Sequence, residues 1–155
     1  MLFVLFVFRK KISVICAFWN KKMNFDKQLL DDLTAKAKAS PRLRMNLDLR
    51  TTPEDQSQRM LNALEPGTVL PIHRHPKTTE VVTILRGKAV QYLYDDNGNE
   101  TGQVLLEAGG ECTGMSVERG QWHRIESLET GTVIFEAKDG PYEPLQPEDI
   151  IDPAK

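Results

Sequence analysis

Between residues 43 and 138, short segments of alternating apolar and polar residues restrict the possible folds more than any other feature. In residues 43–49, leucine or methionine occupies every second position, with arginine, asparagine and aspartate between. Similar segments follow at 58–65, 69–75, 80–86, 88–94, 102–107, 113–117, 122–128 and 131–138, and glycine-containing turns separate most of them. Strands have a side-chain period of two, and such turns join hairpins. The sequence therefore predicts an antiparallel β-sandwich or barrel.

One helix is predicted ahead of the strands, over about residues 26–39. Asp26 can accept hydrogen bonds from the first-turn amides as the N-cap, and Phe25 before it can pack on Leu30. Pro41 prevents the helix from continuing. The apolar stripe of the helix consists of Leu29, Leu30, Leu33 and Ala37. Because a fold that alternates strands and helices needs several helices, a single one favours a mainly β protein.

The first 22 residues do not fit this pattern. Two apolar runs, 1–8 and 12–19, are separated by Arg9, Lys10 and Lys11. Neither run reaches the roughly 18 to 20 residues that span a bilayer, and the positive charges do not precede the apolar run as they would in a signal peptide. We expect residues 1–22 to be a translated leader upstream of a true start at Met23. A short membrane anchor and a structural strand are the alternatives.

Charge and cysteine content limit the partners and the compartment. The 20 basic and 22 acidic side chains nearly balance, and no run of like charges indicates a nucleic-acid or membrane partner. The two cysteines, Cys16 and Cys112, are not clustered, which is typical of a reducing compartment. We therefore expect a cytoplasmic protein with one domain. Residues 145–155, which are rich in proline and acidic residues, are expected to form a surface tail.

The placement of the histidines indicates a metal site. The chain has 3 histidines, and two of them, His73 and His75, project from the same face of a strand because they are two residues apart. Glu80 begins the next segment, and His123 begins a later one. Three imidazoles and one carboxylate would suit one divalent ion of Fe, Mn, Ni, Co or Zn. The alternative for any single histidine is an ordinary surface or core residue.

Two longer stretches resemble known motifs. Residues 67–87, GTVLPIHRHPKTTEVVTILRG, resemble the first cupin motif without an insertion, and residues 114–127, GMSVERGQWHRIES, resemble the second. Glu118 and Ser127 stand where that second motif usually has proline and asparagine. The resemblance implies a small jelly-roll barrel, or double-stranded β-helix, with the metal inside. Cupins often pair through sheet edges, so a homodimer is left open.

A narrower resemblance extends beyond the motifs. The segments 40–50, 58–68, 73–80 and 135–144 look like those of the WbuC-type cupin-fold metalloproteins of bacteria, and the similarity covers about residues 23–144. We therefore expect a cupin domain with its N-terminal helix over 23–144. Members of this family often lie among genes for cell-surface polysaccharide synthesis, which implies a link of that kind.

Strand periodicity also indicates which residues surround the metal. If Glu80 faces inward, Val82 and Ile84 do so too, and His123 brings Ile125 inward. A mainly apolar pocket is then expected. Arg44 and Asn46 share the polar face of the early strand, where they could hold an anionic group or be solvated, and we favour solvation. Trp122 and Tyr92 could stack on a ligand ring or pack in the barrel. The full set of candidates for the substrate pocket is Arg44, Asn46, Ile84, Tyr92, Trp122 and Ile125. We expect Cys112 to be an ordinary buried cysteine and not a redox partner.

These features favour a mononuclear metal-binding cupin that acts on a small polar molecule such as a sugar, a keto compound or an enediol. An isomerase or a dioxygenase would fit. The alternatives are a small-molecule or carbohydrate binding module or sensor without turnover, and a barrel whose metal is purely structural. A metal-free sugar epimerase is disfavoured, because such an enzyme needs a histidine base and every histidine here is assigned to the metal.

Overall fold

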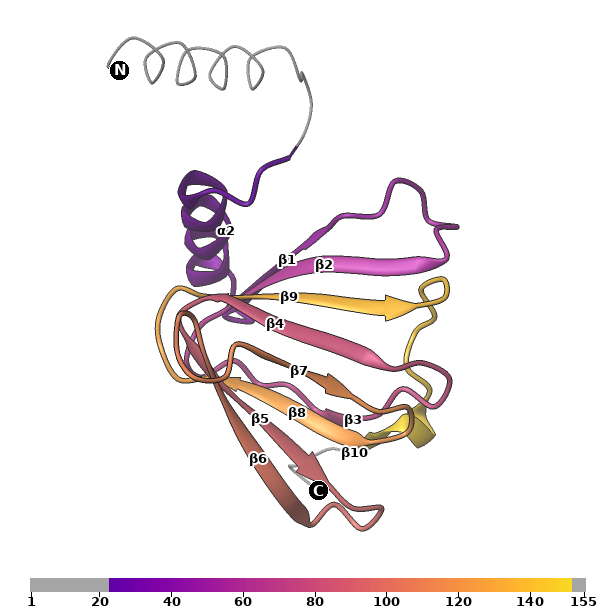
Figure 1. Ribbon diagram of the computed structural model, residues 1–155. Helices are drawn as coiled ribbons and strands as arrows, with labels where there is room; N and C mark the ends of the chain where they lie inside the picture. The colour runs from indigo at the N-terminus through magenta and orange to yellow at the C-terminus, as the bar shows by residue number, and fades with distance from the viewer. Residues whose placement is uncertain (1–22, 152–155) are drawn as a thin grey trace, which may run out of the picture.

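The computed structural model describes residues 23–151 as two antiparallel sheets with one α-helix on the outside (Figure 1). The predicted leader 1–22 lies outside the described residues. The first sheet has the order β1 (Arg44–Asp48), β2 (Ser57–Leu64), β9 (Thr132–Asp139), β4 (Glu80–Arg86) and β7 (Gly114–Val117). The second has the order β10 (Ile150–Ile151), β3 (Ile72–His73), β8 (Trp122–Ser127), β5 (Lys88–Tyr94) and β6 (Glu100–Glu107). The predicted jelly roll with one N-terminal helix is confirmed.

Two predicted strands are shorter than the sequence pattern suggests. The segment 69–75 pairs only at Ile72–His73, since Pro71 lacks an amide hydrogen for the ladder. The alternation that starts at Leu43 becomes a strand only at Arg44. Leu43 has a positive φ of 55°, and its carbonyl accepts hydrogen bonds from Glu65 N and Thr68 Oγ1 at 2.9 and 2.6 Å.

The helix α2 (Lys27–Ala39) begins and ends as predicted. The side chain of Asp26 accepts a hydrogen bond from Leu29 N at 3.0 Å, which satisfies a first-turn amide. Phe25 packs against the ring of Phe135 at a centroid distance of 6.3 Å. The buried residues between α2 and the outer face of the first sheet are Leu30, Leu33, Ala37, Leu61, Ala63 and Val133.

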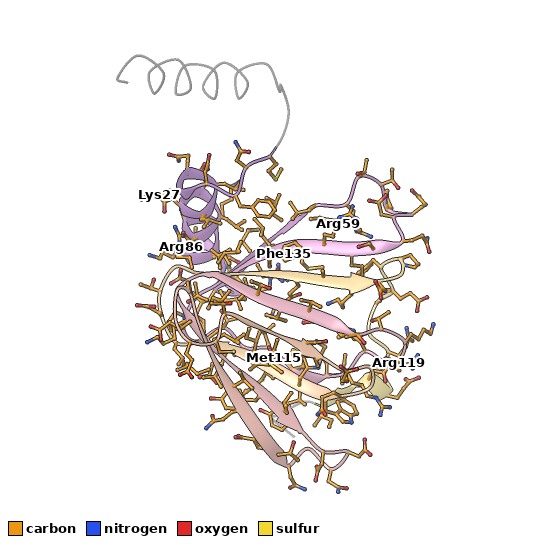
Figure 2. All side chains as sticks on the ribbon, in the orientation of Figure 1. Lys27, Arg59, Arg86, Met115, Arg119 and Phe135 are labelled. Carbon is orange, nitrogen blue, oxygen red and sulfur yellow. The ribbon has the colours of Figure 1, made fainter. Side chains whose placement is uncertain are left out.

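Arg86 fastens the helix to the end of β4. Its Nη2 donates to Leu30 O at 2.8 Å and to Thr34 Oγ1 at 2.9 Å, and its Nη1 lies 2.6 Å from Asp31 Oδ1. Figure 2 shows this side chain beside α2. The helix thus covers the face of the first sheet that does not face the second sheet.

A second core lies between the two sheets. Its buried members are Leu64, Val82, Ile84, Ala89, Leu106, Ile125 and Ile134. Residues directly opposite one another on paired strands share a face. Ile84 pairs with Ile134 and Val82 with Glu136, so the inner face of the first sheet becomes polar along β9.

The end of the described chain is more than a surface extension, although residues 145–155 are predicted to be a surface tail. Residues Pro147–Asp149 form a 3-10 helix, and Ile150–Ile151 form β10, which pairs with β3. Asp149 is buried and accepts a hydrogen bond from Arg74 Nε at 2.9 Å. None of the helices described is both long and apolar enough to cross a membrane.

Candidate metal centre

Strand pairing and one short loop bring the four predicted ligand residues together. His73 on β3 is the register partner of His123 on β8. His75 follows β3, and Glu80 begins β4 after the loop. Gly120 N donates to His75 O at 2.9 Å, so the turn before β8 holds the backbone of the second histidine. The four side chains come from both sheets and meet inside the barrel.

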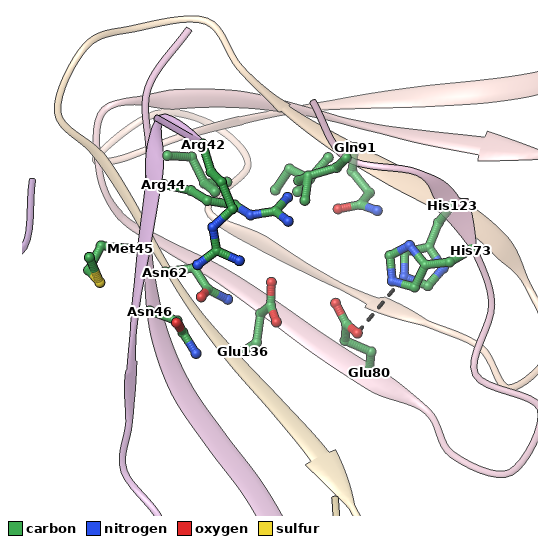
Figure 3. Close-up of a pocket in the computed structure, with 13 residues that line it drawn as sticks. Arg42, Arg44, Met45, Asn46, Asn62, His73, Glu80, Gln91, His123 and Glu136 are labelled. Atoms are coloured by element: carbon green, nitrogen blue, oxygen red, sulfur yellow. Dashed lines mark ion pairs between the residues drawn. The ribbon is translucent and has the colours of Figure 1, made fainter. Parts of the chain in front are cut away.

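The ligand atoms of these residues lie within 4.8 Å of one another. The centroid distances between the imidazole rings are 5.1 Å for His73 and His75, 4.4 Å for His73 and His123, and 5.5 Å for His75 and His123. Glu80 Oε2 lies 3.0 Å from His75 Nε2. It lies 3.9 Å from His123 Nε2, and Figure 3 shows Glu80 facing His123. Glu80 and His123 are 4% and 2% exposed, so the cluster is closed on that side.

Backbone carbonyls orient two of the rings. His73 Nδ1 contacts Pro71 O at 3.2 Å and His123 Nδ1 contacts Gln121 O at 2.8 Å. A carbonyl oxygen can only accept, so each Nδ1 carries the proton and each Nε2 keeps its lone pair. Among the described residues, the buried Nε2 atom of His123 has no hydrogen-bond partner, whereas His75 Nε2 faces the carboxylate of Glu80 at 3.0 Å. An imidazole whose Nδ1 donates to a backbone carbonyl and whose Nε2 keeps its lone pair is suited to ligate a divalent metal ion.

Burial keeps two of the histidines, His73 and His123, neutral. It lowers the pKa of His73 from 6.5 to about 3, with a further contribution from His123, and it also lowers the pKa of His123. For Glu80, burial alone would raise the pKa, but the contact with His75 and the charge of Lys138 outweigh it and leave the carboxyl pKa below its ordinary value. Neutral imidazoles and an ionised carboxylate are the forms that ligate metals.

Two charged residues beside the cluster were not predicted from the sequence. Lys138 Nζ lies 2.8 Å from Glu80 Oε2 and 3.7 Å from Glu136 Oε2. Burial, together with the charge of Glu80, raises the pKa of Glu136 to about 7. Both residues lie on β9, where Lys138 is opposite Glu80 and Glu136 is opposite Val82 of β4. The sequence shows that these two residues are two positions apart and so share one face of β9. Only the pairing of β9 with β4 shows that this face lies at the site.

A cavity of about 280 Å³ opens beside the cluster. Its lining residues are Arg42, Arg44, Met45, Asn46, Asn62, Leu64, Leu70, His73, Glu80, Gln91, His123, Ile125 and Glu136. The expected pocket was mainly apolar, but the lining combines apolar side chains with several charged and amide groups. A polar stripe crosses the first sheet, because Asn46 pairs with Asn62 and the neighbouring strand β9 adds Glu136. The apolar pocket was inferred from residues of β4 and β8, and the polar side chains come from β1, β2 and β9, which were not considered.

Three of the predicted pocket residues line this cavity, namely Arg44, Asn46 and Ile125. The other three do not. Ile84 is buried in the core between the sheets. Trp122 belongs to a separate cluster with Tyr94, against which Tyr92 packs. Adjacent strand residues face opposite ways, so the residue next to His123 cannot share its face.

Trp122 and Cys112 both lie outside the metal cluster. Trp122 is buried, donates from Nε1 to Asp96 Oδ1 at 3.0 Å, and lies under the guanidinium of Arg74 at 4.5 Å, which makes it a packing residue. Cys112 is half-buried against the core between the sheets and contacts Gly114 O. Neither residue belongs to the four-residue cluster.

Comparisons with known proteins add a family and a set of similar folds. A model of the family described as "Domain of unknown function (DUF6016)" matches residues 25–106. No match is found among curated proteins. KdgF from Halomonas sp. aligns with a TM-score of 0.52 and 13% identity over 66% of this chain and 84% of the KdgF chain.

Two other solved structures have higher TM-scores. An oxalate oxidase in complex with the substrate analogue glycolate has a TM-score of 0.57 and 18% identity over 81% of this chain and 67% of its own. The capsular polysaccharide assembling protein CapF from Staphylococcus aureus has a TM-score of 0.57 and 22% identity over 68% of this chain and 29% of its own. This chain thus spans less than a third of CapF. At these identities the likeness shows a common fold.

Proposed function

Because this chain belongs to the DUF6016 family and has the cupin fold, we propose that it is a mononuclear metal-binding cupin that acts on a small polar molecule. The ion would be held by His73, His75, Glu80 and His123. The observation that carries the proposal is the meeting of these four side chains, of which His123 has a buried Nε2 atom without a hydrogen-bond partner among the described residues.

The surroundings of the cluster favour a metal site that contacts a ligand over a metal site that is purely structural. His73, Glu80 and His123 line the cavity as well as the cluster. A structural metal would be expected in a closed shell without such access. A bound divalent ion would supply Lewis-acid chemistry there, or O₂ chemistry if it were iron. The cavity brings the polar groups of a small molecule next to that position.

The residues of this chain also indicate how protons would be handled. His73 and His123 are buried and neutral, with their Nδ1 atoms committed to backbone carbonyls. These two residues are therefore unsuited to serve as a free histidine base. Glu136, whose pKa is about 7 and which lines the cavity, could hold or release a proton near neutral pH.

The substrate class is proposed from chemistry and from the resemblances together. Sugars, 2-keto acids and enediols all carry neighbouring oxygens that can approach a metal ion. The WbuC-type resemblance and the likeness to CapF, a capsular polysaccharide assembling protein, support a link to bacterial surface polysaccharide synthesis. A binding module or sensor that holds the same ligand without turnover is the second candidate, because the cavity and the cluster would serve it equally.

The test begins with protein purified without a histidine tag. We expect elemental analysis to find one divalent ion per chain, and His123→Ala to lower metal affinity more than about tenfold, since it removes a ligand with a free nitrogen. Nucleotide sugars, keto acids and enediols are then assayed with metal-free and metal-restored protein while O₂ uptake is recorded. Turnover by rigorously metal-free protein would refute the metal role. Tight binding without turnover under any metal would favour the binding module.

A further inference from the structure

The cavity beside the metal centre contains a buried polar side chain without a partner. Gln91 on β5 is 1% exposed, yet neither its amide nitrogen nor its amide oxygen makes a hydrogen bond to any residue that the structure describes. Figure 3 shows this amide pointing into the cavity on the same side as His123. Buried amides are almost always paired because leaving them unpaired is unfavourable. This amide is therefore suited to a ligand oxygen that accepts a hydrogen bond from its NH₂ group, and a hydroxyl could also donate one to its oxygen.

The register explains why Gln91 faces the cavity. Gln91 pairs with Ile125 on β8, and the next inward position of β8 is His123. An amide at this position of β5 must share the inner face with those two residues. Its neighbours on that face within β5 are Ala89 and Leu93, which cannot satisfy a polar group. The lack of a partner thus follows from the strand pairing.

Positive charge gathers in another part of the same cavity. Among the described residues, neither Arg42 nor Arg44 forms an ion pair, and Arg44 donates only from Nη1 to Val69 O at 3.0 Å. Burial and the charge of Arg42 lower the pKa of Arg44, so the two cations lie close enough to disfavour each other. Figure 3 shows both guanidinium groups turned into the cavity. An anionic ligand group would relieve this repulsion.

The arginine pair and the unpaired amide together define a ligand. We propose that the cavity binds a small hydroxy or keto carboxylate, with its carboxylate on Arg42 and Arg44 and its hydroxyl or carbonyl oxygen on the amide of Gln91. The cavity of about 280 Å³ suits a molecule of that size and not a polymer. The inference rests on the proposed function, since it names the class of small polar molecule that would lie beside the metal centre.

The test is calorimetric titration with glycolate, lactate, pyruvate, gluconate and galacturonate, each compared with its neutral amide or methyl ester. Metal-loaded and metal-free wild-type protein are both titrated. We expect at least one acid to bind at least about tenfold more tightly than its neutral counterpart, because a charged and bidentate contact exceeds a neutral one. The preference should persist in metal-free protein, since neither the arginines nor Gln91 belongs to the metal cluster.

Variants separate the two contacts. Arg44→Gln should lower the affinity for the acid about tenfold and leave the neutral counterpart unchanged. Arg59→Gln, on the outer face of β2 where Arg59 pairs with Asp55, is the matched control and should change neither. Gln91→Leu and the unbranched Gln91→Met should bring the affinity for lactate down to that for propionate, which lacks the hydroxyl. The melting temperature should stay unchanged or rise in both, because an unpaired buried amide is removed.

Each outcome has a distinct meaning. If every acid binds no better than its neutral counterpart, or if none binds, while the wild-type protein holds one metal ion, this inference is overturned and the proposed function stands. If the wild-type protein binds no divalent ion, the proposed function fails. In that case a carboxylate preference that disappears in Arg44→Gln would still support the anion position.

Discussion

Lys138 sets the charge balance next to the metal cluster. Its ammonium group, with a side chain that is 9% exposed, lies between the carboxylates of Glu80 and Glu136. The charges of these two carboxylates raise the pKa of Lys138 despite burial, which lowers it. Without that cation, two buried carboxylates would face each other across β4 and β9. Lys138 therefore helps to keep Glu80 ionised, and its charge also lowers the pKa of His123.

We expect Lys138→Met to destabilise the metal-free protein by about 3 to 5 kcal/mol, the usual effect of removing one partner from a buried ion pair. The loss should be smaller with a divalent ion bound, because the ion would neutralise Glu80. Urea unfolding of both forms measures the difference. Lys88→Met is the control, since its ion pair with Glu107 is solvent-accessible and should contribute much less to stability. Equal losses in both metal states would contradict this role.

The buried histidines predict how stability depends on pH. His73 has an ordinary pKa of 6.5, and burial lowers it to about 3 in the folded protein. Between these values the unfolded chain binds more protons than the folded one, so the free energy of unfolding of metal-free protein should fall as pH falls from about 6.5 towards 3. Urea unfolding across this range measures the slope. His73→Gln should flatten it, and an unchanged slope would show that the ring is not buried neutral.

Among the secondary-structure elements, β10 and the turn before it support the strand that carries the first histidine. β10 pairs with β3 at Ile150 and His73. Arg74 N also donates to Asp149 O at 3.1 Å, while the side chains of the two residues form an ion pair at 2.9 Å. β3 has only two residues of its own. Its position therefore depends on contacts made more than seventy residues later in the chain.

We expect Asp149→Ala to destabilise the protein by about 1 to 3 kcal/mol, because it leaves a partly buried guanidinium without its partner. It should also lower metal affinity, since the backbone between His73 and His75 loses a support. Chemical unfolding and competition with a chelator measure the two effects. Glu148→Ala changes the exposed neighbour and should alter neither the stability nor the metal affinity. Normal metal affinity in a clearly destabilised Asp149→Ala protein would show that the two properties are independent.

For the chain as a whole, a protein that starts at Met23 should keep the melting temperature and the metal content of the full chain. The capped helix begins at Lys27 and its first aromatic contact at Phe25. The family match also begins at residue 25. Thermal unfolding and elemental analysis of both chains provide the comparison. Insolubility, or a melting temperature lower by several degrees, would show that residues 1–22 take part in the fold.

Local patterns in the sequence determined the elements and the identity of the candidate ligands. The helix could be predicted because Asp26, the apolar stripe and Pro41 act within a few residues of one another. β4 and β5 were predicted to the residue for the same reason, since the turn at Gly87 bounds both. The spacing of His73, His75 and Glu80 is also local. His123 is far away in the sequence, and it was added because it begins a later strand segment and because its motif resembles a known one.

Only the tertiary structure decided what surrounds those ligands. Lys138 and Glu136 reach the site because β9 pairs with β4, and Asn62 reaches the cavity because β2 pairs with β9. Period-two alternation says which residues of a strand share a face, but not which strand lies beside it. The same limit explains why the pocket was expected to be apolar. Burial, pKa and the unpaired amide of Gln91 all arise from that pairing, so they appear only when the sheets are assembled.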